Sequence, residues 1–285
     1  MRLMQPILMV IFCLFFVTLA QAGNAKSALT ESQYPPDIAA IKESGVLRVA
    51  MVSAGVPPFF MQDAQGNWTG IDVDFDRLTA QALGVKLVIV SIPTYDGVID
   101  AVANGQADLG GGLLSVTPDR ALRVKFSDGT YAYHPSLLVN RMQMNRLGWN
   151  IVNVVSHLQL TNQPLKIGAL QYSANIALLQ GAAPAAEIIT FPTEDAALEA
   201  VAKGDVFAAM SDTPEQMNNW LNAHPRAALT TVQGVLTSRS VLFGVAMSWK
   251  SENLREWMNV FIKNLESLHM RETLFEKYQV EDPGA

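Results

Sequence analysis

The sequence has almost no cysteine, no strongly basic region and no paired histidines. Its one cysteine, Cys13, lies inside an N-terminal apolar run, so the rest of the chain has no thiol for a disulfide, a thiolate metal site or a nucleophile. The four histidines lack the spacings that are typical of metal ligands. The formal net charge is −6 and the basic residues are scattered, which argues against nucleic acid as a partner. We therefore expect no metal, no cofactor and no nucleic acid.

The N-terminus has the pattern of a cleaved signal peptide. An apolar run extends from Ile7 to Leu19, and Ala20-Gln21-Ala22 has the small-x-small pattern that signal peptidase accepts. The run is shorter than the roughly 20 residues that span a bilayer, although an uncleaved N-terminal anchor is the alternative. We expect residues 1–22 to be removed from an exported, soluble protein.

After residue 36, apolar strands alternate with amphipathic helices, several of which end at a glycine. This alternation predicts βαβ units and a mainly parallel sheet. It occurs twice, which predicts two α/β lobes with a ligand site between them. The expected strands are 46–50, 86–90, 107–109, 165–170, 187–190, 206–210 and 241–247. The expected helices are 37–44, 72–83, 95–104, 174–180 and 193–203, with Asp72 as the cap of the second. A long C-terminal helix should follow, with an apolar stripe from Leu254 to Leu268.

A glycine-rich stretch, residues 110–120, follows the first unit's third strand. In open α/β sheets ligands bind outside the carboxyl ends of strands, and glycines let backbone N–H groups approach an anion. Ser115 adds a hydroxyl, and Arg120 has the geometry to hold a carboxylate through two charge-assisted hydrogen bonds. The alternative is a simple turn with a solvated Arg120. The stretch has neither G-x-G-x-x-G nor Gly-Lys-Ser/Thr, so it is not a nucleotide phosphate loop of those types.

Asp212 stands at the equivalent place in the second unit, just after a strand. Its carboxylate suits an ammonium group, and so a zwitterion that Arg120 already holds. The alternative is that Asp212 caps the helix that begins near Pro214. Ser173 would donate to the same ligand carboxylate, and Tyr95 would lay its ring over the ligand. Ser173 and Tyr95 could equally be a helix cap and a packing residue.

Several motifs along the chain match one known family. The matching segments are Gly45–Val49, Pro58-Phe59, Gly66–Asp74, Gly105–Asp108, Ser115–Arg120, Phe126–Asp128 with Tyr131, Ile167–Gln171, Ala202–Asp205, Ser211-Asp212 and Leu274–Tyr278. The chain therefore resembles the periplasmic amino-acid-binding proteins of ABC transporters, solute-binding protein family 3. The resemblance implies the two-lobed α/β periplasmic-binding-protein (Venus-flytrap) fold of type II, each lobe a mainly parallel sheet flanked by helices.

The resemblance also implies how the chain is divided. The expected parts are a signal peptide at 1–22, a first lobe made of 37–136 plus 241–285, and an inserted second lobe at 137–240. Two extended hinge crossings would connect the lobes, near Leu137–Asn140 and near Ser238–Leu242.

Seven ligand contacts follow from the resemblance, and they are Tyr95, Gly112, Leu113, Ser115, Arg120, Ser173 and Asp212. Arg120 would bind the α-carboxylate with help from Ser115 and Ser173. Asp212 and the backbone carbonyl of Gly112 would bind the α-ammonium, and the Tyr95 ring would stack on the ligand.

Departures from the family pattern bear on the ligand. Val56 stands where many relatives have an aromatic ring, and Ser53 replaces an acidic residue that pairs with basic ligands. Tyr172 and Ala174 interrupt the usual Gly-Thr/Ser pair. Together with Leu113, the residues at 53, 56 and 174 predict an uncharged ligand side chain, because an unpaired cation is costly to bury.

The resemblance implies a monomeric periplasmic protein that captures a small amino-acid-like ligand and delivers it to a membrane ABC permease. A periplasmic cyclohexadienyl dehydratase is the first alternative, since such enzymes look similar through the first lobe. Their second lobe carries an acidic residue after a Gly-Gly-Thr step, for which Tyr172–Asn175 is a poor match. A ligand-sensing protein that reports to a membrane receptor is the second alternative. We assign no catalytic residue.

Overall fold

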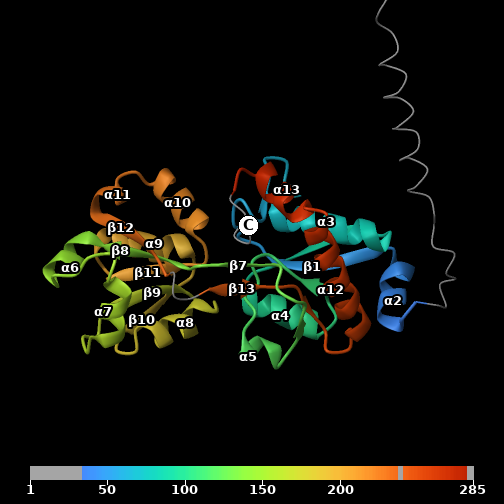
Figure 1. Ribbon diagram of the computed structural model, residues 1–285, viewed down its shortest axis with the longest axis horizontal. Coiled ribbons are helices and arrows are strands. Elements are labelled where there is room, and N and C mark those ends of the chain that lie inside the picture. Colours follow the sequence, from blue (N-terminus) through green and yellow to red (C-terminus); the bar gives the residue numbers. More distant parts are fainter. Residues whose placement is uncertain (1–33, 237–239, 281–285) are drawn as a thin grey trace, which may run out of the picture.

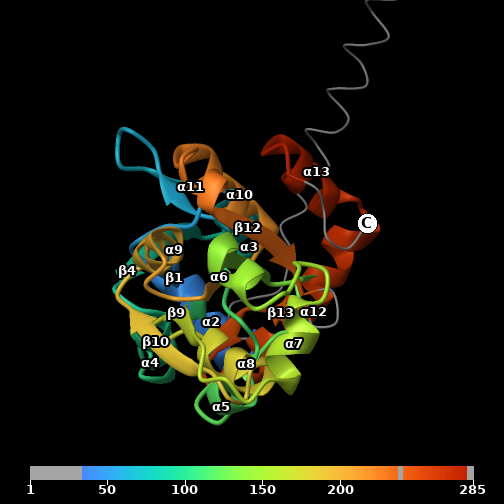
Figure 2. The ribbon, with the colours of Figure 1, turned by 90° about the vertical axis from the view of Figure 1, so that its left-hand side faces the viewer.

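The computed structural model describes residues 34–236 and 240–280. The expected signal peptide at 1–22 and Cys13 lie outside the described residues. The described chain forms two α/β lobes that stand side by side (Figure 1), and Figure 2 views the molecule from the end of the second lobe. The two-lobed fold predicted from the sequence is confirmed.

The first lobe is built on a five-stranded sheet of order β4-β1-β5-β14-β6. β1 (Val46–Val52) pairs in parallel with β4 (Lys86–Ile92) and with β5 (Leu109–Gly110). β14 (Ala246–Met247) is antiparallel to β5 and to β6 (Lys125–Phe126). The sheet is therefore mixed, with β14 opposed in direction to the other strands.

Helices cover both faces of this sheet, with α3 and α4 on opposite sides of β1 (Figure 1). Gly45 and Gly84 end α2 and α3 in the left-handed conformation, and their N–H groups bond to last-turn carbonyls, as the sequence predicts. The elements of this lobe outside the sheet are α2 (Pro36–Ser44), β2 (Met61–Gln62), β3 (Trp68–Thr69), α3 (Ile71–Leu83), α4 (Tyr95–Ala103), α5 (Pro118–Ala121), α12 (Glu252–Ser267) and α13 (Met270–Lys277).

The second lobe repeats this arrangement with the order β10-β9-β11-β8-β12. β9 is parallel to β10 and β11, while β8 is antiparallel to β11 and β12. In chain order the elements are β8 (Ser136–Asn140), α6 (Arg141–Arg146), α7 (Val154–Leu160), β9 (Lys166–Leu170), α8 (Asn175–Ala182), β10 (Glu187–Phe191), α9 (Glu194–Lys203), β11 (Ala208–Ser211), α10 (Pro214–Ala223), α11 (Ala227–Thr230) and β12 (Thr231–Val235).

The two segments that cross between the lobes pair with each other. β7 (Tyr131–Tyr133) and β13 (Val241–Phe243) form a separate antiparallel ladder. The prediction of one strand over 241–247 is wrong, because β13 and β14 belong to different sheets. The chain breaks between them at Gly244, where a Cβ would lie 3.0 Å from a methyl of Val116.

The crossings lie slightly outside the expected hinges. Residues Leu137–Asn140 belong to β8, which is hydrogen-bonded on both sides within the second sheet. The first crossing therefore precedes β8, at residues 134–135. The second expected hinge, Ser238–Leu242, lies partly outside the described residues, and its last two residues belong to β13.

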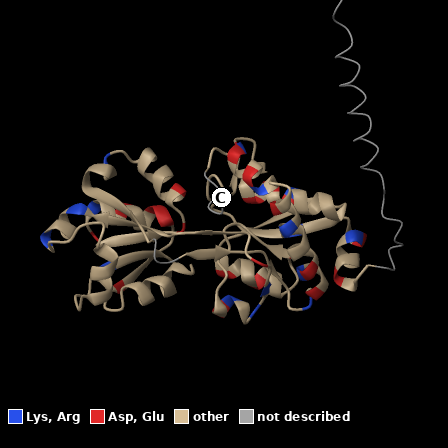
Figure 3. Ribbon diagram, in the orientation of Figure 1, with Lys and Arg blue, Asp and Glu red and all other residues tan. Residues whose placement is uncertain are grey.

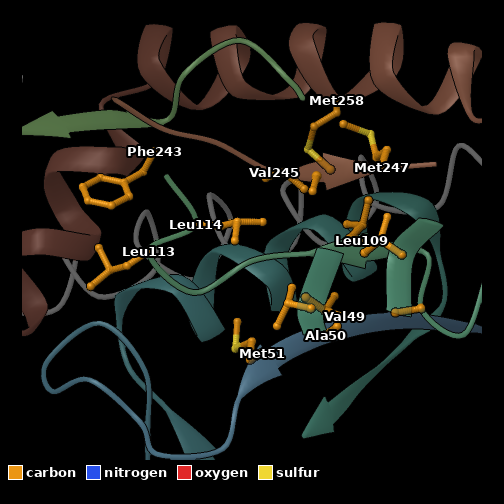
Figure 4. Close-up of a cluster of buried hydrophobic side chains, with 14 of the residues drawn as sticks. Val49, Ala50, Met51, Leu109, Leu113, Leu114, Phe243, Val245, Met247 and Met258 are labelled. Carbon is orange, nitrogen blue, oxygen red and sulfur yellow. The ribbon is translucent and has the colours of Figure 1, made fainter. Parts of the chain in front are cut away.

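Each lobe has its own apolar core. In the second lobe, alternate residues of β8 face opposite sides of the sheet, with Leu137 and Val139 in one cluster and Leu138 in the other. Figure 4 shows part of the first lobe's core, where Leu109 of β5 and Met247 of β14 pack near each other.

The C-terminal helix α12 packs on the first lobe as an amphipathic element. It buries Leu254, Met258, Ile262 and Leu265, which recur at the helical period. The predicted extension of this stripe to Leu268 is wrong, because the helix ends at Ser267 and the Leu268 side chain is exposed. No helix in the described part of the chain has the length and apolarity needed to cross a bilayer.

The start of α3 yields a stability prediction. Gly70 has φ 125°, and a Cβ there would overlap the carbonyl group of Phe59, whereas Gly66 has φ 82° and nothing within 4 Å of its Cβ position. We expect Gly66→Ala to cost about 1 kcal/mol, from backbone strain alone. Gly70→Ala should cost about 3 kcal/mol or more, because steric overlap is added to that strain.

Urea denaturation of both variants measures the difference. Equal losses of unfolding free energy at the two positions would contradict the close approach of Gly70 to Phe59.

Candidate functional site

The glycine-rich loop after β5 is held in place by the buried carboxylate of Asp72, which lies on α3. Gly112 and Leu113 both have left-handed φ values, 75° and 52°. Asp72 accepts hydrogen bonds from the backbone N–H of Leu113, at 2.9 Å, and from the Tyr131 hydroxyl. The prediction that Asp72 caps α3 is wrong, because the helix begins after Gly70 with no side-chain cap. The Asp72 carboxylate instead fixes the loop on which several predicted contacts lie.

Arg120 is buried, not solvated. It lies in the short helix α5, which Thr117 caps, and only 8% of its surface is exposed. Its Nη1 donates to the carbonyl of Ser115 at 2.9 Å, and its Cζ lies 5.7 Å from the centre of the Tyr95 ring. A guanidinium has five N–H donors, so most of its donor capacity remains for a ligand. Burial lowers the pKa of Arg120, opposed by Tyr95 and Asp212, and the group remains charged at neutral pH.

Tyr95 is placed by the start of α4. Thr94 caps this helix by accepting from the N–H of Gly97, and Tyr95 is its first residue. The ring is 6% exposed. Burial raises the pKa of Tyr95 well above its ordinary value, and the carboxylates of Asp212 and Glu194 raise it further. The Tyr95 phenol of the first lobe is thus close enough to acidic groups of the second lobe for their charges to raise its pKa.

Asp212 occupies the end of β11 in the second lobe, and it is 5% exposed. Thr213, not Asp212, caps α10 by accepting from the N–H of Gln216. Asn175 donates to Asp212, but the Oδ1 atom of Asp212 has no hydrogen-bond partner among the described residues. Burial raises the pKa of Asp212 to about 6, opposed by Asn175 and by the charge of Arg120. Asp212 is therefore a charged, incompletely bonded carboxylate at neutral pH.

The structure brings Arg120, Tyr95 and Asp212 together from both lobes. Ser115 is buried beside Arg120 through its carbonyl group. The Ser173 hydroxyl already donates its one proton to the carbonyl of Leu170, at 2.6 Å. Its role as a donor to a ligand carboxylate stays a prediction.

The remaining predicted contacts, Gly112 and Leu113, line a small cavity inside the first lobe. Figure 4 shows Leu113 near Phe243, which lines the same cavity. Asp76 also lines it, is 2% exposed, and has an Oδ2 atom without a partner among the described residues. Burial, and then the charge of Asp72, raise the pKa of Asp76 well above its ordinary value.

Glu194 is a site residue that the sequence analysis missed. It is the first residue of α9, where an acid is commonplace because it complements the helix dipole, so no sequence signal singled it out. Burial, and then the charge of Asp212, raise the pKa of Glu194 to about 8, opposed by a hydrogen bond from Ser211. Glu194 is thus mostly protonated at pH 7.

Two of the histidines stack on tryptophans of the second lobe. His157 stacks on Trp149 and His224 stacks on Trp220. The described residues contain no group of three or more His, Cys, Asp or Glu side chains placed to hold a metal ion. Acidic and basic residues are interspersed over both lobes (Figure 3).

Comparisons with known proteins identify the family and the fold of the chain. The model of the bacterial extracellular solute-binding proteins, family 3, matches residues 47–281. The crystal structure of an ancestral amino acid-binding protein, a precursor of cyclohexadienyl dehydratase, matches with a TM-score of 0.69 and 27% identity over 85% of this chain and 98% of that one. A lysine complex of a binding component of an ABC transporter from Wolinella succinogenes, itself described as putative, matches with a TM-score of 0.67 and 25% identity over 83% of this chain and 97% of that one.

Curated relatives match over shorter stretches. Membrane-bound lytic murein transglycosylase F of Aliivibrio fischeri is 24% identical over 187 residues, which are 65% of this chain and 36% of the relative. Cyclohexadienyl dehydratase of Pseudomonas aeruginosa is 35% identical over 88 residues, which are 30% of this chain and 32% of the enzyme. The matches thus span about a third of the length of these two relatives.

The buried carboxyls predict how stability depends on pH. The pKa values of Asp72 and Asp212 are raised to about 6 and that of Glu194 to about 8, so between pH 5 and 8 the folded state holds protons that the unfolded chain has lost. The free energy of unfolding should therefore fall as pH rises, by at most about 1.4 kcal/mol per pH unit for each proton. Urea denaturation of the ligand-free protein at several pH values measures this slope.

Glu194→Gln should flatten the slope between pH 6.5 and 8. Glu199→Gln is the matched control on the same helix, because Glu199 is exposed and its pKa is lowered, so it stays charged throughout this range. A slope that Glu194→Gln leaves unchanged would contradict the protonated state of Glu194.

Proposed function

The chain belongs to family 3 of the bacterial extracellular solute-binding proteins, and from this premise we propose that it captures a free α-amino acid between its lobes. The observation that carries the proposal is the pairing of buried, incompletely bonded opposite charges: Arg120 from the first lobe and Asp212 from the second. An α-amino acid carries the complementary charges on adjacent groups.

In the proposed binding mode, Arg120 and Asp212 each pair with one charged group of the ligand. The ligand carboxylate accepts two parallel hydrogen bonds from the Arg120 guanidinium, whose planar fork matches carboxylate geometry. The α-ammonium donates to the free oxygen of Asp212 and to the carbonyl group of Gly112. Tyr95, already beneath the Arg120 guanidinium, supplies an aromatic face for the rest of the ligand.

Ligand binding and lobe closure are coupled in this mode. Arg120 and Asp212 belong to different lobes, so one zwitterion contacts both lobes only when they approach each other. Such a ligand binds the closed form more tightly than the open form, and that difference in affinity shifts the population towards closure. The β7–β13 ladder between the lobes supplies two adjacent crossings at which a hinge motion can occur.

The cellular role follows from the family. We place the protein in the periplasm, where the closed, ligand-loaded form would present a surface made by both lobes to an ABC permease. The binding component of an ABC transporter from Wolinella succinogenes, which was solved with lysine, supports this role. A monomer suffices for it, because both halves of the site lie in one chain.

A second candidate function is a dehydratase-like activity. One observation favours it: Glu194 is a partly buried acid whose pKa is raised to about 8, so it mostly holds its proton at neutral pH, as a general acid must. The dehydratase of Pseudomonas aeruginosa and the ancestral precursor of that enzyme class add support by similarity. An assay for turnover of prephenate distinguishes the two functions, since a binding protein leaves this acid unchanged.

Isothermal titration with the common α-amino acids tests the binding function. We expect at least one amino acid to bind, and Arg120→Ala or Asp212→Asn to weaken that binding by about 100-fold or more, because each leaves a buried ligand charge without its partner. Arg123→Ala is the matched control, because Arg123 lies three residues away in partly exposed ion pairs with Asp96 and Asp100. Its effect on affinity should be below about threefold.

Thermal unfolding of each ligand-free variant shows whether it is folded. Unchanged affinity in a folded Arg120→Ala protein, or failure of every amino acid to bind the wild type, would refute the proposal.

A further inference from the structure

The small cavity inside the first lobe has features of a second binding site. It lies between α3, the glycine-rich loop and the two C-terminal helices α12 and α13, and residues 111–114 of the loop form one wall. Its volume is about 50 Å³. One water molecule needs about 10–15 Å³ of such space, so the cavity has room for about three or four non-hydrogen atoms.

Two carboxyl groups of α3 line this cavity. Asp72 and Asp76 are four residues apart, a spacing that places both on one side of a helix. Only 8% of the surface of Asp72 and 2% of that of Asp76 is exposed. The Oδ2 atom of Asp76 has no hydrogen-bond partner among the described residues, and it lies 3.6 Å from the point where a Cβ of Gly111 would stand. A buried carboxyl group with an unused acceptor therefore lies against the loop.

These two carboxyl groups favour a cation beside them. Burial raises the pKa of Asp72 only to about 6, so this group is charged at neutral pH, and its charge is close enough to raise the pKa of Asp76. The charge of Arg77 also acts on Asp76, but the Arg77 guanidinium is bonded to Asp74. A buried negative charge is costly until a positive one is placed near it. A cation in the cavity would reduce that cost whether or not Asp76 is ionised.

Aromatic rings form much of the remaining wall. Phe75 of α3, Tyr131 of β7, Phe243 of β13 and Phe275 of α13 all line the cavity. The centre of the Tyr131 ring lies 5.6 Å from that of Phe243 and 5.5 Å from that of Phe275. An aromatic face attracts a cation that lies within about 6 Å of the ring centre, and it also packs well against alkyl groups. The wall thus suits a cation that carries a short apolar chain.

The same wall does not suit a metal ion. Magnesium and calcium ions take about six or more oxygen ligands. Within the part of the chain that the structure describes, no three His, Cys, Asp or Glu side chains are grouped to hold a metal ion. An ammonium group needs fewer acceptors, because it donates only through its own N–H bonds.

Glu266 of α12 and Arg271 of α13 line the cavity where it approaches solvent. Their side chains are 43% and 20% exposed, and the Arg271 Nη1 atom lies 3.1 Å from the Glu266 Oε1 atom. The opposite charges of this pair offset each other. A small cation that enters between α12 and α13 therefore meets little net repulsion.

We propose that this cavity is a second binding site and that it takes a small primary alkylammonium ion. The ammonium group donates to the Asp76 carboxyl group and lies near the Asp72 carboxylate, while the alkyl chain contacts the aromatic rings. Occupancy would act on the loop that carries Gly112 and Leu113, because that loop is one wall of the cavity. The inference does not depend on the proposed capture of an amino acid between the lobes.

Thermal unfolding of the protein without an amino acid tests the site. Propylammonium chloride is the probe, 1-propanol is its neutral counterpart of nearly the same size, and potassium chloride controls for ionic strength. At about ten times its dissociation constant, propylammonium should raise Tm by about 3 °C or more, and 1-propanol should raise it by less than about 1 °C. Cyclohexylammonium is too large for the cavity and should also raise Tm by less than about 1 °C.

Two variants locate the bound amine. Asp76→Asn removes the carboxyl group but keeps the size of the side chain, and it should abolish the rise in Tm. Asp212→Asn is the same substitution at a buried position of the second lobe, where an amine could bind between the lobes instead. The rise in Tm should persist in Asp212→Asn.

A rise that persists in Asp76→Asn, or one that Asp212→Asn abolishes, would overturn the inference. A wild-type protein that propylammonium stabilises no more than potassium chloride or cyclohexylammonium does would overturn it as well. This last comparison needs no variant, so it tests the site even if Asp76→Asn does not fold. Failure of the inference would leave the proposed amino-acid function standing, because that function depends on Arg120 and Asp212.

Discussion

A charge that is removed from water must find a partner, and this constraint ties together the two lobes of the protein. Arg120 and Asp212 are each more than nine-tenths buried, and they belong to different sheets. Neither has its hydrogen-bonding capacity filled within its own lobe. The Arg120 guanidinium lies over the aromatic ring of Tyr95, and the charge of Asp212 acts on the phenol of the same residue. A small zwitterion is the simplest ligand that satisfies both charges at once.

The loop that presents Arg120 depends on contacts that are distant in the sequence. Asp72 holds the loop from α3, and the start of α3 is in turn held by the Tyr278 hydroxyl, to which the N–H of Gly70 donates at 3.0 Å. Asp74, also on α3, accepts from Tyr278 and from Lys277. The last described residues of the chain thus support the ligand loop of the first lobe, even though the second lobe intervenes in sequence.

The way the lobes are joined is consistent with a site that opens and closes. Each sheet contains one strand of opposite direction, β14 in the first lobe and β8 in the second, and each follows a crossing from the other lobe. The crossings are short and pair as β7 and β13. A narrow two-stranded connection resists separation of the lobes but allows bending through a few backbone dihedrals. The site residues themselves lie on strand ends and helix starts, which are rigid within each lobe.

Much of the fold and half of the site could be predicted from local sequence. Period-two and helical patterns, with Gly45 and Gly84 as helix ends, located most strands and helices, because these signals act over a few residues. The position of Arg120 after a glycine-rich strand end, and of Asp212 after another, indicated a zwitterion site by the general rule for parallel sheets. The pattern over 241–247 failed, because a run of apolar residues does not reveal that Gly244 divides it between two sheets.

What only the tertiary structure decided was which of these side chains lose contact with water, and beside which others. Glu194 and Asp195 are adjacent acids in the first turn of one helix, yet one faces Asp212 and Tyr95 while the other is exposed. Asp72 had the sequence context of a helix cap, but it accepts from Leu113, 41 residues away. Burial and electrostatic partners are set by strand order and by the approach of two lobes, so they depend on residues far apart in the chain. The sequence determined the elements and the residue types at their ends, and the packing of those elements determined their chemistry.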